Sequence, residues 1–441
     1  MNSMTPYTPG LKRLRAFDTV VRARSGLAAA AELRVSQPAI AYSLDQLERE
    51  LGLRLLERRA SGSFATGDGV AFFNRTRRFL DQIGEAVRDT LAASGEPPQK
   101  AESIISKLRD TQIAALIAIW RAGGFRAAAR RLSVAEPTLQ RPARELERLL
   151  RVGLYRRTAA GVEVNPVGAE LARRLALALG EIHSGMEEIG ALRANERASL
   201  RVGVLALSPR VILAEGLGSL LGGLPAQRVD IVEGSYEDHA ASIRAGTIDV
   251  IFGALRSPPL YGDLVEEPLL EDPYAIVCRV GHPLATADRP LTADLLAYEF
   301  ILPTTGLPRR VTLDAFFKSH GMASNARVET SCLPTTIALL KASDRLALLS
   351  RWHADLDNRD ELVCLDSVNV PHLPRFVGLT TRADWLPTPF QATFLAMTRK
   401  AAAKWVATKP TRSSKPRRQG VVPRASSAPR TGRNTRVAPI R

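Results

Sequence analysis

The chain has 441 residues, of which 45% are hydrophobic, and this suits about two to four domains with complete cores. No apolar run approaches the roughly 18 residues of a membrane helix, and the first residues lack the apolar core of a secretion signal, so we expect a cytoplasmic protein without a membrane partner. The formal charge of +16 is uneven, because residues 399–441 hold 13 Lys and Arg and no acidic residue, which leaves +3 for the other 398.

Two short helices are predicted near the N-terminus. Apolar residues recur with helical spacing over residues 11–21, and small side chains over residues 28–33 allow a second helix to pack closely against the first. The residues that form the apolar stripe of the first helix are Leu14, Phe17, Val20 and Val21.

A third helix is predicted from Ser36, a good N-cap, to Leu51, and Gly52 follows as its stop. Pro38 falls in its first turn, where a missing N–H costs nothing. The buried face is expected to hold Ile40, Leu44, Leu47 and Leu51. The opposite face carries mostly small and amide side chains, at Gln37, Ala39, Tyr42, Ser43, Gln46 and Arg49.

An exposed helix of this kind after a tight turn fits the major groove of DNA. A Gln side chain pairs bidentately with adenine, an Ala methyl contacts thymine, and a helix N-terminus favours phosphate. A basic β-turn follows and would form a wing against the DNA backbone. The alternative for a small three-helix unit is a protein-interaction module. The predicted DNA-binding residues, around a helix-turn-helix from Ser25 to Leu44, are Ser36, Gln37, Pro38, Ala39, Tyr42, Ser43, Arg49, Arg58 and Arg59.

Residues 11–70 resemble the winged helix-turn-helix of LysR-type transcriptional regulators. The sequence departs from the family pattern at Leu56, where Phe is usual, and at Ala41, where Ser is usual. The motifs that carry the resemblance are Ala29-Ala30, Val35 to Pro38, Leu47-Glu48, Leu51-Gly52, Leu55 to Arg58 and Thr66 to Gly69.

The same pattern returns 99 residues later, where residues 132–157 match residues 33–58 at nine of 26 positions. The matched positions are mostly those of the predicted core, and Gly161 and Gly168 repeat the wing glycines Gly62 and Gly69. We therefore expect residues 110–170 to fold like residues 11–70. Tandem copies of this kind resemble a smaller subgroup of the family. The repeated apolar stripe of the first helix is Ile113, Leu116, Ile119 and Trp120.

The predicted reading face differs between the two copies. Ser36-Gln37 becomes Ala135-Glu136, which removes the N-cap and puts a carboxylate where phosphates would approach. Pro142 lies inside the third helix of the second copy and is expected to bend or break it, at a cost of about 3 kcal/mol. The second copy either reads a different sequence or serves as a spacer and dimer element, and we favour the first copy as the main reader. The candidate contacts of the second copy are Glu136, Thr138, Arg141, Arg144 and Arg157.

A long amphipathic helix is predicted after each wing. The near-heptad spacing in the second of them suits a partner helix, although packing on its own domain is the alternative. LysR-type proteins dimerise through a long linker helix, so the resemblance implies a homodimer or homotetramer, and we favour pairing through this second helix. Its seam consists of Leu171, Leu175, Ala178, Ile182, Met186 and Ile189.

From Leu200 onward, predicted strands alternate with predicted helices, which indicates a parallel sheet. Residues 199–398 resemble the LysR-type effector domain, two Rossmann-like lobes related to periplasmic binding proteins. The stretches that carry this resemblance are Asp249 to Gly253, Val277 to Leu284 with His-Pro-Leu, and a helix from about Leu333 followed by LALLSR.

A ligand of such a fold binds between the lobes, at strand C-termini and helix N-termini. Hydroxyl and backbone N–H groups at these places suit a small organic anion. Any one of these Ser and Thr residues also fits an ordinary cap or turn. The candidate effector-binding residues are Ser208, Gly234, Ser235, Thr304, Thr305 and Ser331.

Motifs for catalysis, metal or cofactor binding are not found in the sequence. The six histidines are scattered without HxxxH or HExxH spacing, and GxSxG, Walker and GxGxxG motifs are missing. We therefore predict no enzyme activity, no catalytic residues, no metal and no cofactor. The cysteines Cys278, Cys332 and Cys364 lie far apart, which favours inert thiols over disulfides. Cys332 alone falls near the predicted cleft, where a redox-sensing thiol is the alternative to a buried small residue.

The predicted protein is a multidomain transcriptional regulator, built from two α-rich winged units and an α/β two-lobed domain, that binds double-stranded DNA and a small organic effector. A solute-binding sensor and an architectural DNA-binding protein with little sequence preference are the alternatives. The Pro-, Ser- and Arg-rich tail is expected to be disordered, and either attracts phosphate in a salt-dependent way or has no role. The predicted segments are 1–70 and 109–169 for the winged units, 71–108 and 170–198 for the linker helices, 199–398 for the effector domain and 399–441 for the tail.

Overall fold

The computed structural model describes residues 8–407, apart from 160, 192–197, 223–226, 288–291, 322, 324–325, 359, 369 and 371–374. A three-helix unit with a β-hairpin, here called the first unit, opens the described chain. Its elements are α1 (Leu11–Ala23), α2 (Gly26–Leu33), α3 (Gln37–Leu51), β1 (Leu56–Arg59) and β2 (Gly62–Ala65).

Local interactions at both ends of α3 agree with the sequence. The Ser36 hydroxyl accepts a hydrogen bond from the Ala39 amide, and Gly52 ends the helix in the left-handed conformation with φ of 64°. The Glu48 carboxylate then accepts hydrogen bonds from the amides of Leu55 (2.7 Å) and Leu56 (3.0 Å). This carboxylate fixes the direction in which the wing leaves the helix.

A second unit repeats this order of elements. Its Glu147 carboxylate accepts from the amides of Leu154 (2.8 Å) and Tyr155 (3.3 Å), as Glu48 does in the first unit. Arg151 takes the left-handed position of Gly52 with φ of 58°, a conformation that costs a non-glycine residue about 1 kcal/mol. Its elements are α6 (Asp110–Ala122), α7 (Phe125–Leu132), α8 (Glu136–Leu150), β3 (Tyr155–Thr158) and β4 (Gly161–Val164).

The expected break at Pro142 is not there. Helix α8 continues through the proline to Leu150. The carbonyl that loses its donor belongs to Thr138, which is exposed, so water can take the place of the missing N–H. The buried face of α8 then keeps the helix in place through Leu139, Ala143, Leu146 and Leu150.

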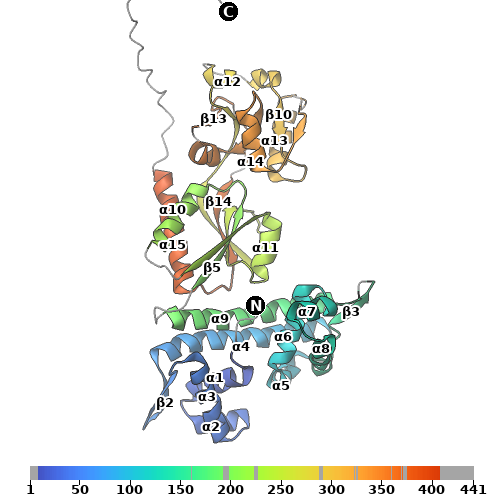
Figure 1. Cartoon of the computed structure of the whole chain (residues 1–441), viewed down its shortest axis with the longest axis vertical. Coiled ribbons are helices and arrows are strands. Elements are labelled where there is room, and N and C mark those ends of the chain that lie inside the picture. The colour runs from blue at the N-terminus through green and yellow to red at the C-terminus, as the bar shows by residue number, and fades with distance from the viewer. Residues whose placement is uncertain are drawn as a thin grey trace, which may run out of the picture.

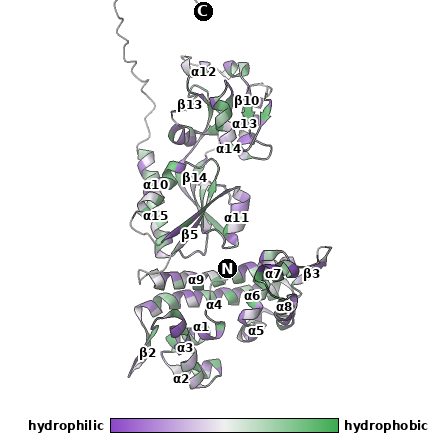
Figure 2. Cartoon of the chain, in the orientation of Figure 1, coloured by the Kyte–Doolittle hydropathy of each residue, from purple (hydrophilic) through white to green (hydrophobic). Residues whose placement is uncertain are grey.

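Two long helices, α4 (Gly67–Ala93) and α9 (Pro166–Ala191), follow the two hairpins and pack against each other. We call them the helix pair. Figure 1 shows them side by side beneath the C-terminal domain, and Figure 2 shows hydrophilic and hydrophobic patches alternating along both. The predicted seam of α9 is therefore covered by α4 of the same chain. The expectation that this seam joins a second chain is wrong for this structure, because an apolar stripe does not specify which helix covers it.

The segment between the units differs from the predicted linker helix over 71–108. Helix α4 ends at Ala93, and a 3-10 turn η1 (Pro98–Lys100) and a short helix α5 (Ala101–Lys107) lead to α6. One continuous core runs through both units and the helix pair, including Phe17, Phe72, Ile83, Leu116 and Ile182. The two units are thus joined by buried apolar contact rather than by an open linker.

The first lobe of the C-terminal domain is a five-stranded sheet in the order β6-β5-β7-β14-β8. Strands β5, β6 and β7 run parallel, whereas β14 pairs antiparallel with both β7 and β8. The elements of this lobe are β5 (Ser199–Leu205), α10 (Arg210–Leu221), β6 (Arg228–Gly234), α11 (Tyr236–Arg244), β7 (Val250–Ala254), β8 (Leu264–Glu271), β14 (Phe376–Arg382) and α15 (Pro389–Ala407).

The second lobe is another five-stranded sheet, in the order β11-β10-β12-β9-β13. The last helix, α15, returns to the first lobe, where Arg399 pairs with Glu267 (2.7 Å). Residues 399–407, which were assigned to the tail, are therefore helical, and residues 408–441 lie outside the described residues. The elements of the second lobe are β9 (Tyr274–Arg279), α12 (Pro283–Thr286), η2 (Thr292–Ala297), β10 (Phe300–Leu302), α13 (Pro308–Ser319), β11 (Val328–Glu329), α14 (Leu333–Lys341), β12 (Leu346–Ser350), η3 (His353–Asp357) and β13 (Leu362–Cys364).

Candidate DNA-binding surface and interlobe pocket

The N-terminal turn of α3 is the most exposed part of the first unit. Ser36, Gln37, Pro38 and Ala39 are all exposed, and Tyr42 keeps 63% of its surface in water. On the opposite face, Ile40, Leu44 and Leu47 are buried. A helix that is buried along one face and open along the other is free to enter a groove without disturbing the core.

Ser43 and Arg49 complete the predicted set on α3. Ser43 is half-buried and donates its hydroxyl to the Ala39 carbonyl (2.8 Å). The exposed Arg49 guanidinium pairs with Asp45 one turn earlier. Exposed pairs of this kind are weak, so Arg49 can exchange Asp45 for a phosphate.

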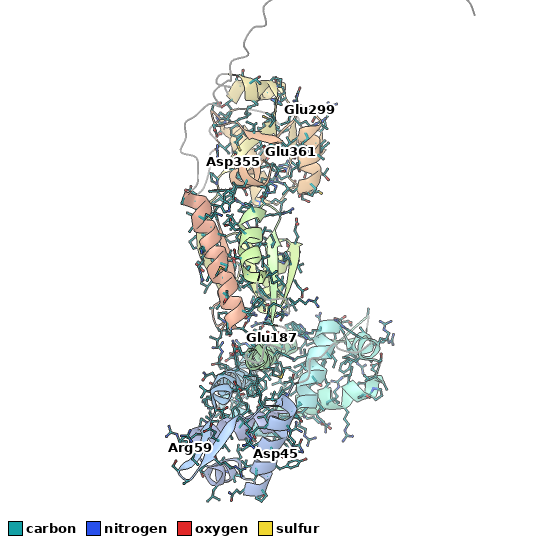
Figure 3. The ribbon with its side chains drawn as sticks, turned by 60° about the vertical axis from the view of Figure 1, so that its left-hand side comes forward. Asp45, Arg59, Glu187, Glu299, Asp355 and Glu361 are labelled. Carbon is teal, nitrogen blue, oxygen red and sulfur yellow. The ribbon has the colours of Figure 1, made fainter. Side chains whose placement is uncertain are left out.

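The wing places its two predicted arginines in solvent. Arg58 is exposed, and Arg59 pairs with Glu57 (2.9 Å) and stacks over the Phe64 ring at 5.5 Å. Asp45 of α3 and Arg59 of β1 lie at the end of the molecule farthest from the C-terminal domain (Figure 3). Helix α3 and the wing therefore face away from the two lobes.

The predicted DNA contacts of the second unit also lie on its surface, but several of them form ion pairs or hydrogen bonds with other residues of α8. Arg141 pairs with Glu145 (3.1 Å), and Arg144 pairs with Glu147 (2.6 Å). Half-buried Glu136 accepts a hydrogen bond from Gln140 (2.9 Å), whereas Thr138 and Arg157 are exposed. Ala135 caps α8 without a side-chain hydrogen bond. The positive charge of this helix is therefore partly neutralised by its own carboxylates.

The six predicted effector-binding residues do not meet in one pocket. Ser208 is fully buried and donates to the Phe252 carbonyl (3.1 Å). Ser235 caps α11 and donates to Asp238 (2.7 Å), next to half-buried Gly234. The Thr305 amide donates to Glu329 (3.0 Å), beside half-buried Thr304, and Ser331 is exposed just before α14.

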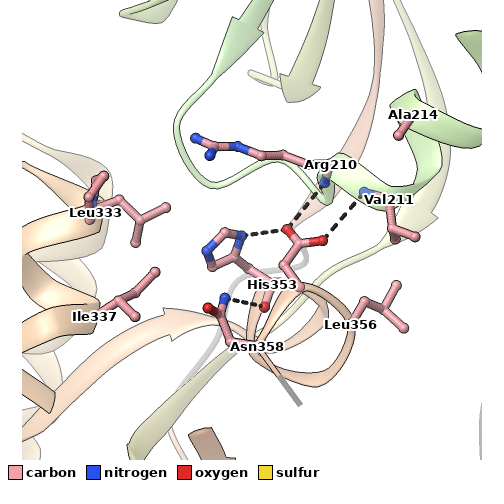
Figure 4. A pocket seen from close by; sticks show the side chains of 10 residues that line it. Arg210, Val211, Ala214, Leu333, Ile337, His353, Leu356 and Asn358 are labelled. Carbon is pink, nitrogen blue, oxygen red and sulfur yellow. Dashed lines mark hydrogen bonds and ion pairs between the residues drawn. The ribbon is translucent and has the colours of Figure 1, made fainter. Parts of the chain in front are cut away.

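A pocket of about 450 Å³ lies where α10 of the first lobe approaches α14 and η3 of the second. Figure 4 shows its polar wall, where the Asp357 carboxylate accepts hydrogen bonds from the amides of Arg210 (3.2 Å) and Val211 (3.3 Å). His353 Nδ1 lies 2.8 Å from the same carboxylate. The lining residues are Arg210, Val211, Ala214, Leu333, Pro334, Ile337, His353, Leu356, Asp357 and Asn358.

Sequence reasoning missed this pocket. Ser208 lies two residues before the lining residue Arg210, and Ser331 lies two residues before the lining residue Leu333. The sequence therefore indicated the helix N-termini at this pocket but not the side chains that line it. The polar residues His353 and Asp357 come from a π-helical turn, η3. Their i, i+4 spacing was the only hint of their contact in the sequence.

The three thiols differ in exposure and in pKa. Burial raises the pKa of Cys278 to about 12, and burial also raises the pKa of Cys364, which is hydrogen-bonded to Asp355. Cys332 is exposed, and a hydrogen bond from the Thr335 hydroxyl (3.1 Å) lowers the pKa of its thiol. The expectation that Cys332 is a buried small residue is therefore wrong.

We expect iodoacetamide to alkylate Cys332 well before the other two cysteines in the native protein, because only a thiolate that reaches solvent reacts quickly. Peptide mass spectrometry after timed alkylation near pH 8 measures the order. A Cys332→Ser variant should then leave the native chain almost unlabelled. Equal labelling of Cys278 and Cys332 would contradict this assignment.

Groups of three or more side chains suited to hold a metal ion are not found among the described residues. Within the same part of the chain, the helices are too short or too polar to cross a bilayer.

Comparison with known proteins identifies the domains. The family described as "Bacterial regulatory helix-turn-helix protein, lysR family" matches residues 11–78 and 111–169, and the "LysR substrate binding domain" matches residues 193–403. The chain is 26% identical over 393 residues to the transcriptional regulator GalR of Pseudomonas putida, covering 89% of this chain and 97% of that protein.

Other regulators align over a shorter part of the chain. PcaQ of Agrobacterium fabrum is 25% identical over 278 residues, covering 63% of this chain and 89% of that protein. The structure of a full-length OxyR variant from Pseudomonas aeruginosa is similar with a TM-score of 0.48 and 18% identity, covering 69% of this chain and 98% of that one. From the helix-turn-helix and substrate-binding domains together, the chain belongs to the LysR family of transcriptional regulators.

Proposed function

We propose that this regulator binds particular double-stranded DNA sequences through α3. Its second unit is a second winged helix-turn-helix that contacts adjacent DNA. A small organic anion that binds between the lobes controls the DNA binding of both units. It acts in the cytoplasm without enzyme activity. The observation that carries the proposal is the exposed first turn of α3, capped by Ser36 and flanked by the basic wing.

The role of the second unit follows from its charges. Arg141 and Arg144 are each paired with a glutamate of α8, so a phosphate must compete with those carboxylates, whereas Thr138 and Arg157 are exposed. This favours backbone contacts over base reading in the second unit. The alignment with GalR supports a tandem arrangement, because it leaves only about a tenth of this chain unaligned, less than the length of either unit.

The proposed effector is a small carboxylate or similar anion. The amides of Arg210 and Val211 at the start of α10 now bind the Asp357 carboxylate of the other lobe, and helix N-termini favour anions of either origin. Ligand binding that displaced Asp357 would change how the lobes meet, which is a shift between two populations rather than chemistry. Ser208 and Ser331 remain proposed contacts because they come just before α10 and α14 at this pocket. Gly234, Ser235, Thr304 and Thr305 come before α11 and α13 and remain proposed contacts of a separate part of the effector domain.

Two other functions make different predictions. An architectural DNA-binding protein would protect all DNA sequences alike, and a solute-binding sensor would bind its ligand but no duplex. Exposed Arg58 and Arg59 on the wing favour DNA over a protein partner. A footprint confined to defined sites separates the proposed regulator from both.

We expect Gln37→Ala to weaken binding to the preferred sequence by about 1–3 kcal/mol and to relax base preference at one position, because Gln37 would lose a bidentate contact. Sequences selected from a random DNA pool, followed by fluorescence anisotropy on the best of them, measure both effects. Gln46→Ala, the same change near the other end of α3, is the matched control and should have little effect.

Two results would go against this assignment. An equal loss on all sequences would mean that Gln37 contacts only the DNA backbone. A wild-type protein that selects no sequence at all would reject the proposed function itself.

A further inference from the structure

We propose that a single chain of this regulator is built like a dimer of two winged units. The helix pair forms the two-fold interface between them within the chain. Helices α3 and α8 then act as the two different halves of one DNA-binding surface, which binds a DNA site whose two halves also differ. The proposal rests on the proposed function, in which both units contact DNA. It adds that the units act together in one chain and that their half-sites differ. Association of whole chains into a homo-oligomer then uses other surfaces.

The helix pair is antiparallel. Arg75 near the start of α4 hydrogen-bonds Glu188 near the end of α9 (Nε to Oε1, 3.1 Å). Arg174 near the start of α9 pairs with Asp89 near the end of α4 (2.5 Å). The apolar faces of both helices are buried against each other, including Ile83 and Ile182, so the pairing of the helices is part of the core and not a surface encounter.

The two ion pairs are copies of each other. Adding the repeat length of 99 converts Arg75 into Arg174 and Asp89 into Glu188. The arginine of α4 thus pairs with the acidic residue of α9, and the equivalent arginine of α9 pairs with the equivalent acidic residue of α4. Such a reciprocal set of contacts defines an isologous two-fold interface, which ordinarily requires two identical chains. Here both halves belong to one chain.

The same operation predicts that one position must face its own copy on the axis. Residue 82 plus 99 is residue 181, and Gln82 does contact Glu181 (Nε2 to Oε1, 3.3 Å). In a dimer of identical chains this position would bring two identical side chains together. Within one chain the pair has become an amide and a carboxylate, which can form a hydrogen bond.

The C-terminal domain lies over this axis. Gln82 also reaches Asp384 (3.5 Å), while Arg75 donates to the Leu386 carbonyl (2.9 Å). On the other helix, Arg173 donates to the Arg244 carbonyl (3.1 Å). One C-terminal domain therefore spans both helices, on the side away from the first unit (Figure 1). A second chain is not needed to cover that face.

Unlike reading faces follow from this arrangement. The exposed start of α3 presents Gln37 and Tyr42, whereas the matching positions of α8 carry Glu136 and Arg141. Palindromic operators reflect identical recognition helices related by a two-fold axis. A chain whose two halves differ selects a site whose two halves differ.

Cysteine cross-linking tests which helices pair, in full-length protein whose native cysteines are changed to serine. Asp89→Cys with Arg174→Cys, both at positions that solvent reaches, should be joined within one chain by a flexible bismaleimide that alkylates both thiols. The mass on a denaturing gel then stays that of one chain, and peptide mass spectrometry finds the two positions linked. Gln82→Cys alone, treated in the same way, should give no covalent dimer. A link between chains in the first variant, or a cross-linked dimer of the second, overturns the proposal.

DNA selection with the same full-length protein tests the consequence. The selected site should be non-palindromic, and Thr138→Ala with Arg141→Ala should remove protection from one flank only and make the affinity less dependent on salt concentration. A palindromic site that is protected equally on both flanks would overturn the internal dimer while leaving sequence-specific binding intact. Failure to select any sequence would instead reject the proposed function.

Discussion

Replacing Arg75 with methionine should lower the free energy of unfolding by about 3–5 kcal/mol. The Arg75 side chain is only 2% exposed and binds two carboxylates, Glu181 (2.8 Å) and Glu188. Burial lowers the pKa of Arg75, but the hydrogen bonds with Glu188 and Glu181 outweigh it and leave the pKa above its usual value. Without the guanidinium, Glu188 would lose this charge partner, and Glu181 would keep only Arg78 (3.0 Å), among the described residues, as an ion-pair partner at the edge of the core. Urea unfolding followed by circular dichroism measures the loss.

The internal repeat supplies the matched control for this variant. Arg174 occupies the equivalent position on α9 and pairs with Asp89, but both side chains are substantially exposed (34% and 60%). Arg174→Met should therefore cost less than about 1 kcal/mol. Changing Glu181 and Glu188 to apolar residues together with Arg75→Met should recover much of the loss, because the uncompensated charge disappears. Equal effects of Arg75→Met and Arg174→Met would contradict the assignment of Arg75 as a buried centre.

Local features of the sequence predicted the first unit well, because its information is short-range. Ser36 and Gly52 mark the two ends of α3, and Leu14, Phe17 and Val20 of the α1 stripe are buried as their spacing indicated, while Val21 is half-buried. The repeat of 99 residues carried the same elements to the second unit, including Gly161 and Gly168. Periodicity and caps are properties of neighbouring residues, so one chain is enough to read them.

Long-range partners could not be predicted in the same way. The seam of α9 gave the buried face but not its partner, which is α4 of the same chain. A clue existed in the sequence: Arg75 and Asp89 are 14 residues apart, as are Arg174 and Glu188, so the same charges recur along both helices. The pocket was missed for a related reason, because Arg210, Leu333 and His353 meet only after two lobes have folded.

A methyl group added at Gly69 should destabilise the first unit by about 3 kcal/mol or more. An ideal Cβ on Gly69 would lie 2.0 Å from the Leu55 carbonyl oxygen, a backbone atom at the start of the wing. The start of α4 and the wing would have to separate, although the Gly69 amide also binds the Thr66 cap (2.9 Å). Thermal unfolding of Gly69→Ala measures the cost, and DNA affinity should fall with it because the wing moves.

Two other glycines test whether the contact with the Leu55 carbonyl, rather than the loss of a glycine as such, causes the destabilisation by Gly69→Ala. Gly67 begins the same helix and has no atom within 4 Å of an added Cβ, so Gly67→Ala should change stability by less than about 0.5 kcal/mol. Gly168 is the equivalent of Gly69 in the second unit, and its Cβ would lie 2.5 Å from the Leu154 carbonyl oxygen. Gly168→Ala should therefore destabilise as Gly69→Ala does. Equal unfolding temperatures for all three variants would contradict the close packing of each wing on the helix that follows it. The recurrence of glycine at positions 69 and 168 would then lack this explanation.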